Sequence, residues 1–167
     1  MCLPYIDVLF GIEPYHLWKD EQDHQTGDVK DGVPFQPDFK QQDEVFHGFV
    51  KRYPNIKCIA RHVRYAHSCS ENSLMAYLWY DGKTYESQKL RFHILDRVGG
   101  GDAFVSGIIY ALMNEYKPQD IADFGVAESA VKHTIHGDGN ITDDVSLIEH
   151  IMLLFSLYNL NTREHIL

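Results

Sequence analysis

The chain has 167 residues, of which 44% are hydrophobic, so it is long enough to form one domain with a sizeable core. Its formal net charge of −9 argues against binding to nucleic acid or to an anionic membrane, because an acidic protein repels a polyanion. The 3 cysteines lack metal-ligand spacing and no apolar run approaches about 18 residues, which together predict a cytoplasmic protein without a membrane-spanning segment.

The first third of the chain reads as strand, excursion, helix and strand. An apolar run predicts a buried strand over Tyr5 to Phe10, and residues 14–39, rich in Asp, Gly, Gln and Pro, predict an irregular surface excursion. Gln41 to Tyr53 is amphipathic and predicts a helix, and Asn55 to Ala60 predicts a strand. The polar segment from Arg61 to Glu71 then predicts a loop.

The middle of the chain contains a clear hairpin pattern. Two strand-like runs, Asn72 to Tyr80 and Lys83 to Glu86, are separated by Asp81-Gly82, a dipeptide typical of tight hairpin turns. A short apolar run, His93 to Leu95, then suits the end of another strand. Alternating helices and strands favour an α/β layered domain with a mainly parallel sheet.

The most specific segment follows, Asp96-Arg97-Val98-Gly99-Gly100-Gly101-Asp102-Ala103-Phe104. Glycine allows main-chain N–H groups to approach an anion closely, and the N-terminus of the helix that we expect from Asp102 onwards directs positive charge to the same point. Asp102 lies where it can accept a proton from a hydroxyl that attacks the anion. The alternative is a structural glycine turn followed by an ordinary first-turn acid, but the acids on both sides of the glycines favour a phosphoryl-transfer site.

Two further helices are expected towards the C-terminus. Lys117-Pro118 predicts the start of one that ends at His136-Gly137, where the helix dipole favours histidines near its C-terminus. His133 and His136 lack an acid or cysteine at ligand spacing, so they do not indicate a metal site. A turn at Asp138 to Asn140 and a last helix capped by Thr142, with its apolar residues between 145 and 155, complete the chain.

The glycine run D-R-V-G-G-G-D-A-F resembles the C-terminal signature of the ribokinase-type (PfkB) carbohydrate kinases, usually written D-T-x-G-A-G-D-x-F, and is most similar to that of the 2-keto-3-deoxygluconate kinase branch. The resemblance implies a three-layer αβα ribokinase-like fold. It also implies an ATP- and Mg²⁺-dependent phosphoryl transfer to a sugar or sugar-acid hydroxyl, such as 2-keto-3-deoxygluconate to its 6-phosphate. Gly99, Gly100 and Gly101 would form the anion hole and Asp102 would be the general base.

The resemblance suggests roles for four other residues. Asp138 belongs to a G-D element that lies near substrate and nucleotide in these kinases, although it also suits a plain turn. Arg61 and Arg64 fall where the kinases have a loop against the nucleotide, and solvated arginines are an equal alternative. Near the N-terminus, the family pattern N-x-x-E is replaced, so Glu13 is a displaced candidate on the metal side.

The resemblance spans Tyr5 to about Met152, but only as the C-terminal half of such a kinase, within a single domain of residues 1–167. We therefore expect the lid and most of the sugar pocket to be absent, as in a truncated gene product, a subunit from a split gene or a fragment. The candidate partners are a chain that carries an N-terminal half and a second copy in a homo-oligomer. ATP and a small sugar or sugar acid are the expected ligands. The alternative is a catalytically silent remnant that binds a nucleotide or a partner.

Overall fold

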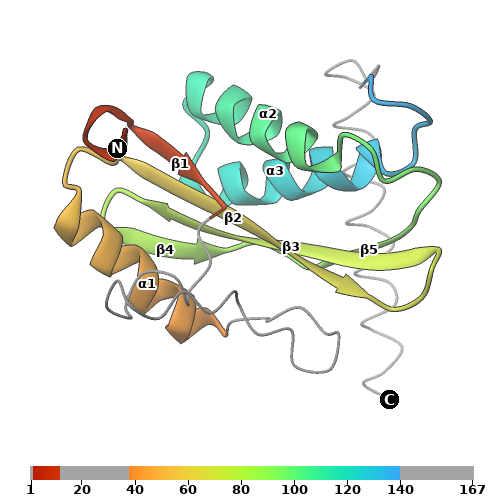
Figure 1. Cartoon of the computed structure of the whole chain (residues 1–167), viewed down its shortest axis with the longest axis horizontal. Helices are drawn as coiled ribbons and strands as arrows, with labels where there is room; N and C mark the ends of the chain where they lie inside the picture. Colours follow the sequence, from red (N-terminus) through yellow and green to blue (C-terminus); the bar gives the residue numbers. More distant parts are fainter. Residues whose placement is uncertain (1, 12–37, 140–167) are drawn as a thin grey trace. The chain divides into compact units, whose positions relative to one another are not determined.

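The computed structural model describes residues 2–11 and 38–139, shown in colour in Figure 1. A 3-10 helix at Leu3–Tyr5 precedes the strands and helices, which are β1 (Val8–Phe10), α1 (Phe39–Arg52), β2 (Cys58–Ala66), β3 (Glu71–Tyr80), β4 (Lys83–Glu86), β5 (Leu90–His93), α2 (Gly100–Met113) and α3 (Pro118–Lys132). The strands form one sheet in the order β1-β2-β3-β4, with β5 paired to β3. No helix in the described ranges is long and apolar enough to cross a membrane.

The described chain divides into two compact units, and β2 and β3 each contribute to both. The first unit contains the described residues up to Arg61 together with Tyr77–Tyr85. The second contains His62–Ala76 and the described residues from Glu86 onwards, including α2 and α3. The expectation of a single domain stays a prediction.

In the first unit, local capping and turn chemistry determine where elements begin. Asp38 caps α1 by accepting a 2.8 Å hydrogen bond from the main-chain N–H of Gln41, whose side chain accepts in return from the N–H of Asp38. The hairpin between β3 and β4 turns at Asp81 and Gly82, both with positive φ, as the sequence predicts. β1 runs parallel to β2, with Val8 opposite Cys58.

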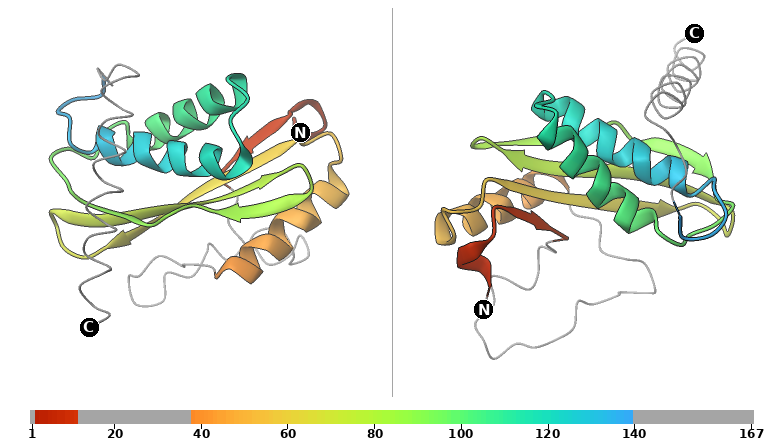
Figure 2. Two further views of the ribbon diagram at one scale, coloured as in Figure 1. Left: turned by 180° about the vertical axis from the view of Figure 1, so that it is seen from behind. Right: turned by 90° about the horizontal axis from the view of Figure 1, so that it is seen from above.

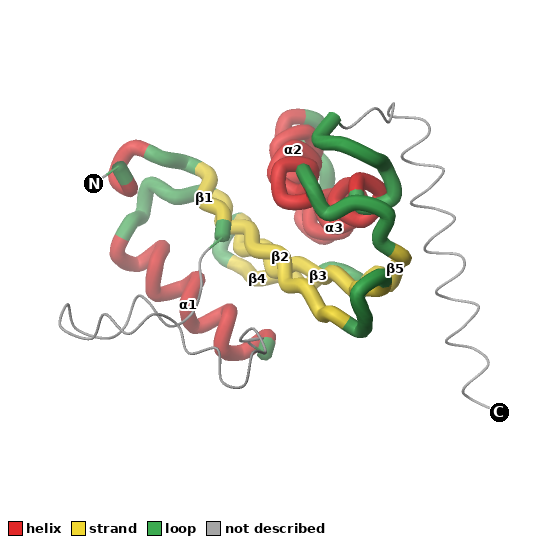
Figure 3. The backbone as a smooth tube through the Cα atoms, turned by 45° about the vertical axis from the view of Figure 1, so that its right-hand side comes forward, coloured by secondary structure: helices red, strands yellow, loops and turns green. Residues whose placement is uncertain are grey.

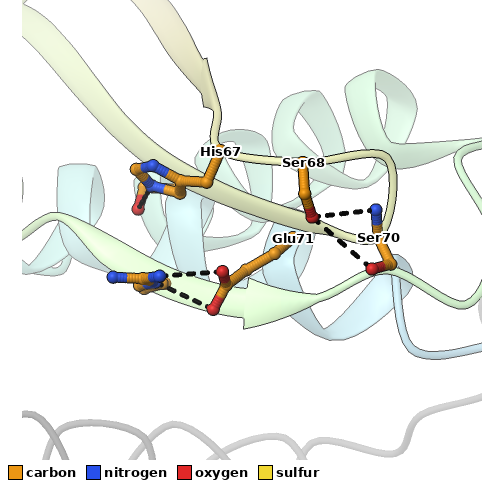
Figure 4. Close-up of polar contacts among 6 residues, drawn as sticks. His67, Ser68, Ser70 and Glu71 are labelled. Atoms are coloured by element: carbon orange, nitrogen blue, oxygen red, sulfur yellow. Dashed lines mark hydrogen bonds and ion pairs between the residues drawn. The ribbon is translucent and has the colours of Figure 1, made fainter.

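In the second unit, β3 and β5 are antiparallel, with Glu71 opposite His93 and Leu74 opposite Leu90. The carboxylate of Glu71 forms a two-fold ion pair with the guanidinium of Arg91 on β5, at 2.7 and 2.9 Å (Figure 4). At the preceding turn, Ser68 and Ser70 hydrogen-bond each other in the same view. These contacts fix the end of the β3–β5 ladder that leads into the glycine run.

Helices α2 and α3 lie side by side in the second unit (Figures 2 and 3). Glycines permit the close approach: a Cβ at Gly107 would lie 3.1 Å from the Cα of Gly125 on α3. Phe104 and Ile108 on α2 and Val126 on α3 are buried. α3 also contacts β5, where the ring of Phe92 packs against that of His133 at 5.1 Å between centroids.

Several predicted boundaries were wrong. β2 continues to Ala66, so Arg61 and Arg64 lie on a strand rather than on the predicted loop. α3 ends at Lys132 instead of His136-Gly137, and β1 begins only at Val8 and is half-buried. The sheet is mixed, because β1 and β2 pair in parallel but β3 and β5 are antiparallel.

The predicted excursion ends one residue earlier than expected, since residue 39 already begins α1. The rest of the excursion at 14–37, Glu13, Thr142 and the last predicted helix lie outside the described residues.

Candidate active site

Residues 94–99 join the end of β5 to the start of α2, and Gly100 and Gly101 already belong to the helix. This is the strand–turn–helix arrangement that the sequence predicts. Gly99 is the residue before the helix and has φ +78°, a left-handed conformation that glycine adopts without strain. No side chain in the described part of the chain caps this helix, and its first hydrogen bond runs from the N–H of Ala103 to the carbonyl of Gly99. The preceding main-chain N–H groups are therefore available to an anion.

Three side chains at the end of α3 support the glycine run. The hydroxyl of Ser129, fully buried, donates a 2.8 Å hydrogen bond to the carbonyl of Gly100. The ring of His133 fills the space beside Gly100, where a Cβ would be 3.0 Å from each ring nitrogen and would overlap Cε1. The Cε of Lys132 would be 3.1 Å from a Cβ at Gly99. The run is therefore glycine because α3 already occupies the side-chain space of two of its residues.

A second set of bonds holds the residues before the glycines against the segment after α3. The N–H groups of Leu95 and Asp96 both donate to the carbonyl of His133, at 2.8 and 3.1 Å. The carboxylate of Asp96 accepts from the N–H of Val98 at 3.0 Å and of Gly137 at 2.9 Å, and these two bonds lower its pKa. Asp96 is therefore an ionised structural acid rather than a proton acceptor for substrate.

Asp102 is exposed and lies in the first turn of α2. The hydroxyl of Ser106 donates to its main-chain carbonyl at 2.9 Å, while no described side chain bonds its carboxylate. Asp138 is also exposed, and its main-chain oxygen would be 3.1 Å from a Cβ at Gly99. The fold therefore brings Asp138 to the glycine run, as the second candidate acid beside Asp102.

No family model matches the chain. Over 71 residues, 42% of its length, the chain is 31% identical to a 5-dehydro-2-deoxygluconokinase from Clostridium botulinum, of which it covers 20%. The structure aligns over 90% of the chain with a PfkB family carbohydrate kinase from Listeria grayi at 25% identity, with a TM-score of 0.68. The chain is thus similar in sequence to a sugar-acid kinase and in fold to a PfkB family carbohydrate kinase.

The ribokinase-like α/β fold predicted from the sequence is confirmed by the Listeria structure and by a 2-dehydro-3-deoxygluconokinase from Thermotoga maritima. The latter aligns over 90% of the chain at 24% identity, with a TM-score of 0.72. The chain spans 42% and 43% of the length of these two structures. It therefore has less than half the length of the PfkB kinases with which it aligns.

The two arginine candidates have different surroundings. Arg61 is buried on β2 and donates a 2.7 Å hydrogen bond to the side chain of Gln42. Its contact with a nucleotide stays a prediction. Arg64 is exposed, and its charge helps to lower the pKa of His133, which is lowered first by burial. Arg64 thus contributes positive potential where the PfkB signature lies.

Sequence reasoning missed Arg97 and the supporting residues on α3. Arg97 donates a 3.0 Å hydrogen bond to the carbonyl of Cys69, which ties the turn after β2 to the signature. Ser129, Lys132 and His133 face the glycines from about 30 positions along the chain. A serine and a lysine on an otherwise apolar helix face were the available signal, but such residues usually lie on a solvated face.

Proposed function

We propose that this chain carries the phosphoryl-transfer site of an ATP-dependent kinase that phosphorylates a sugar-acid hydroxyl, with 2-keto-3-deoxygluconate as substrate and its 6-phosphate as product. One observation carries the proposal: the uncapped N-terminus of α2 follows a left-handed glycine and presents an exposed carboxylate, Asp102, in its first turn. The N–H groups that would bind the anion and the carboxylate that would act as the base thus belong to adjacent residues.

In the proposed reaction, the N–H groups of the Gly99–Gly101 run bind the oxygens of the transferring phosphoryl group. Asp102 takes the proton from the sugar hydroxyl while the hydroxyl oxygen forms its bond to the γ-phosphorus. The bond from phosphorus to the bridging oxygen breaks, and ADP leaves with that electron pair. A positioned base contributes about 10²- to 10⁴-fold in rate, and fixed N–H donors stabilise the charge that develops on the phosphoryl oxygens.

The surroundings of the glycine run support an anionic acceptor. Arg64 and Arg97 are exposed cations, and the charge of each helps to lower the pKa of His133, whose ring lies beside Gly100. A guanidinium pairs well with a carboxylate or a phosphate, which suits a sugar acid better than a neutral sugar. The relatives named above are both gluconokinases that act on dehydro-deoxy compounds. Asp138, whose main chain lies close to Gly99, would bind a substrate hydroxyl.

Mg²⁺ would accompany the nucleotide, because it is usually held by one or two carboxylates together with substrate phosphates. The described residues contain no group of three or more potential ligand side chains. Asp138, exposed beside the glycine run, would fit a site of this sparser kind and leaves Asp102 free to act as the base. The role of Mg²⁺ would be to neutralise charge on the phosphates.

We propose that residues corresponding to the other part of the aligned kinases complete the acceptor site, since this chain covers 42% and 43% of those structures. The test measures ATP-dependent phosphorylation of 2-keto-3-deoxygluconate by the purified chain, alone and mixed with the N-terminal half of a related kinase. A parallel assay with 5-dehydro-2-deoxygluconate distinguishes the two acids. Turnover of neither acid, with ATP binding retained, would instead support a silent nucleotide-binding role.

The variant Asp102→Asn tests the base directly. We expect it to lower turnover by at least about 100-fold while ATP affinity and stability stay unchanged, since the carboxylate is exposed. Asp120→Asn is the matched control, because Asp120 is also an exposed acid in the first turn of a helix, α3. Equal activities for the two variants would contradict the assignment of Asp102.

A further inference from the structure

Lys132, the last residue of α3, is fully buried. A buried ammonium is costly unless hydrogen bonds and opposite charges compensate for the lost water. Its Nζ donates to the carbonyls of Gly137 at 2.6 Å and Ile135 at 3.2 Å. Both acceptors belong to the segment that follows its own helix, so the ammonium folds that segment back over the end of α3.

The same segment is held from the other side by the signature. Asp96 accepts from the N–H of Gly137, and Lys132 donates to the carbonyl of that residue. The charge of Lys132 also helps to lower the pKa of Asp96. Asp96, Gly137 and Lys132 therefore form one unit in which the main chain of Gly137 donates to the carboxylate and accepts from the ammonium.

This unit lies directly against the proposed phosphate site. The hydrocarbon stem of Lys132 contacts the position of Gly99, the residue at the N-terminus of α2. Alone, the ionised Asp96, three residues before Gly99, would repel a phosphate bound there. The positive charge of Lys132, held at the carbonyls of Ile135 and Gly137, offsets that repulsion, so that the helix dipole can favour the phosphate.

From this geometry we propose that Lys132 is a positioning residue that serves as a built-in countercharge for the glycine run. It holds Gly137 in place and makes the potential at the N-terminus of α2 favourable to a polyphosphate. The inference rests on the proposed phosphate site, and it names Lys132 as the residue that makes the electrostatic potential of that site favourable to an anion. Arg64 and Arg97, whose charges also reach His133, are exposed, whereas Lys132 is buried and therefore less screened by solvent than these two described cations.

The test uses the full chain and two probes, tripolyphosphate and adenosine, whose affinities are measured by calorimetry. Lys132→Met keeps the apolar stem and removes the charge, whereas Lys132→Arg keeps the charge. We expect Lys132→Met to bind tripolyphosphate about tenfold more weakly, with adenosine affinity unchanged, and Lys132→Arg to retain most of the affinity. Unchanged tripolyphosphate binding by folded Lys132→Met would overturn the inference, while failure of the wild-type chain to bind it would overturn the proposed phosphate site instead.

If Lys132→Met does not fold, Lys132→Ala is refolded in ammonium chloride and, at the same ionic strength, in tetramethylammonium chloride. The small ammonium ion can donate to the carbonyls of Ile135 and Gly137, and the methylated ion cannot. Recovery of tripolyphosphate binding in ammonium alone supports the countercharge. Refolding without that recovery, or no refolding in either salt, assigns Lys132 to folding only and overturns it.

Discussion

The hydroxyl of Ser129 donates a 2.8 Å hydrogen bond to the main-chain carbonyl of Gly100, so that α3 holds the first turn of α2. Ser129→Ala removes this buried bond without changing the volume of the side chain by more than one oxygen atom. We expect the free energy of unfolding to fall by about 1 kcal/mol, the usual net value of one internal hydrogen bond. Urea denaturation measures the change.

Ser106→Ala is the control for that variant, because the hydroxyl of Ser106 bonds a main-chain carbonyl of the same helix but is exposed. Its effect on unfolding should be clearly smaller. A larger loss in Ser106→Ala than in Ser129→Ala would show that the contact between the two helices does not stabilise the glycine run.

Two adjacent glycines of the run should respond in opposite ways to the same substitution. Gly100→Ala places a methyl group in the ring of His133, and we expect a loss of about 1 to 3 kcal/mol, as for other overpacked cores. Gly101→Ala places it in open space on the exposed side of α2, where alanine favours the helix by up to about 1 kcal/mol. Thermal unfolding of both variants measures the contrast, and equal effects would contradict the packing of His133 against Gly100.

The stability of the protein should depend on pH through His133. Burial lowers the pKa of this imidazole below its ordinary value of about 6.5, so below that pH the unfolded chain binds more protons than the folded chain. The contribution is therefore present in full above about pH 6.5 and is lost as the pH falls towards the folded pKa.

The measurement is the slope of the unfolding free energy against pH between about 6.5 and 5, a window set by the ordinary histidine pKa. His133→Gln should flatten that slope, whatever its effect on absolute stability. An identical slope in the variant and the wild type would show that His133 titrates normally in the folded chain.

The cysteines should differ sharply in reactivity. Cys58 is buried on β2, and burial raises the pKa of its thiol to about 12, whereas Cys2 and Cys69 are exposed. Since the thiolate is the reactive form, an aromatic disulfide reagent at pH 8 should modify two thiols quickly and the third only in denaturant. Cys58→Ala should give the same fast stoichiometry and no slow phase, and rapid modification of three thiols in the wild type would contradict the buried position.

Features with local causes could be predicted from the sequence. The hairpin at Asp81-Gly82 follows from the preference of that dipeptide for positive φ. A helix after the glycine run was also predicted, although α2 begins at Gly100, two residues before the expected start at Asp102. The ribokinase-like fold followed from the signature. Asp102 could be singled out for the same reason, since an acid directly after a glycine run is specific by itself.

Features that depend on partners distant in the sequence were missed. α3 ends at Lys132 because the carbonyl of His133 accepts hydrogen bonds from the N–H groups of Leu95 and Asp96, rather than from an N–H group in a further turn of the helix. The burial of Lys132 likewise depends on the segment that folds over it, and a lysine on a helix is ordinarily expected in solvent. β2 extends past Arg61 because pairing in the sheet outweighs the polarity of its last residues.

Because a Cβ at Gly100 would overlap the ring of His133, we expect the residues at these two positions to covary among related chains. Many ribokinase-type signatures resemble G-A-G-D, with alanine where this chain has Gly100, and that methyl group needs room. Chains with alanine there should carry a smaller residue at the position of His133, and chains with histidine there should keep glycine. The pair of alignment columns would then distinguish two packing solutions for the same phosphate loop, independently of the sugar that each kinase binds.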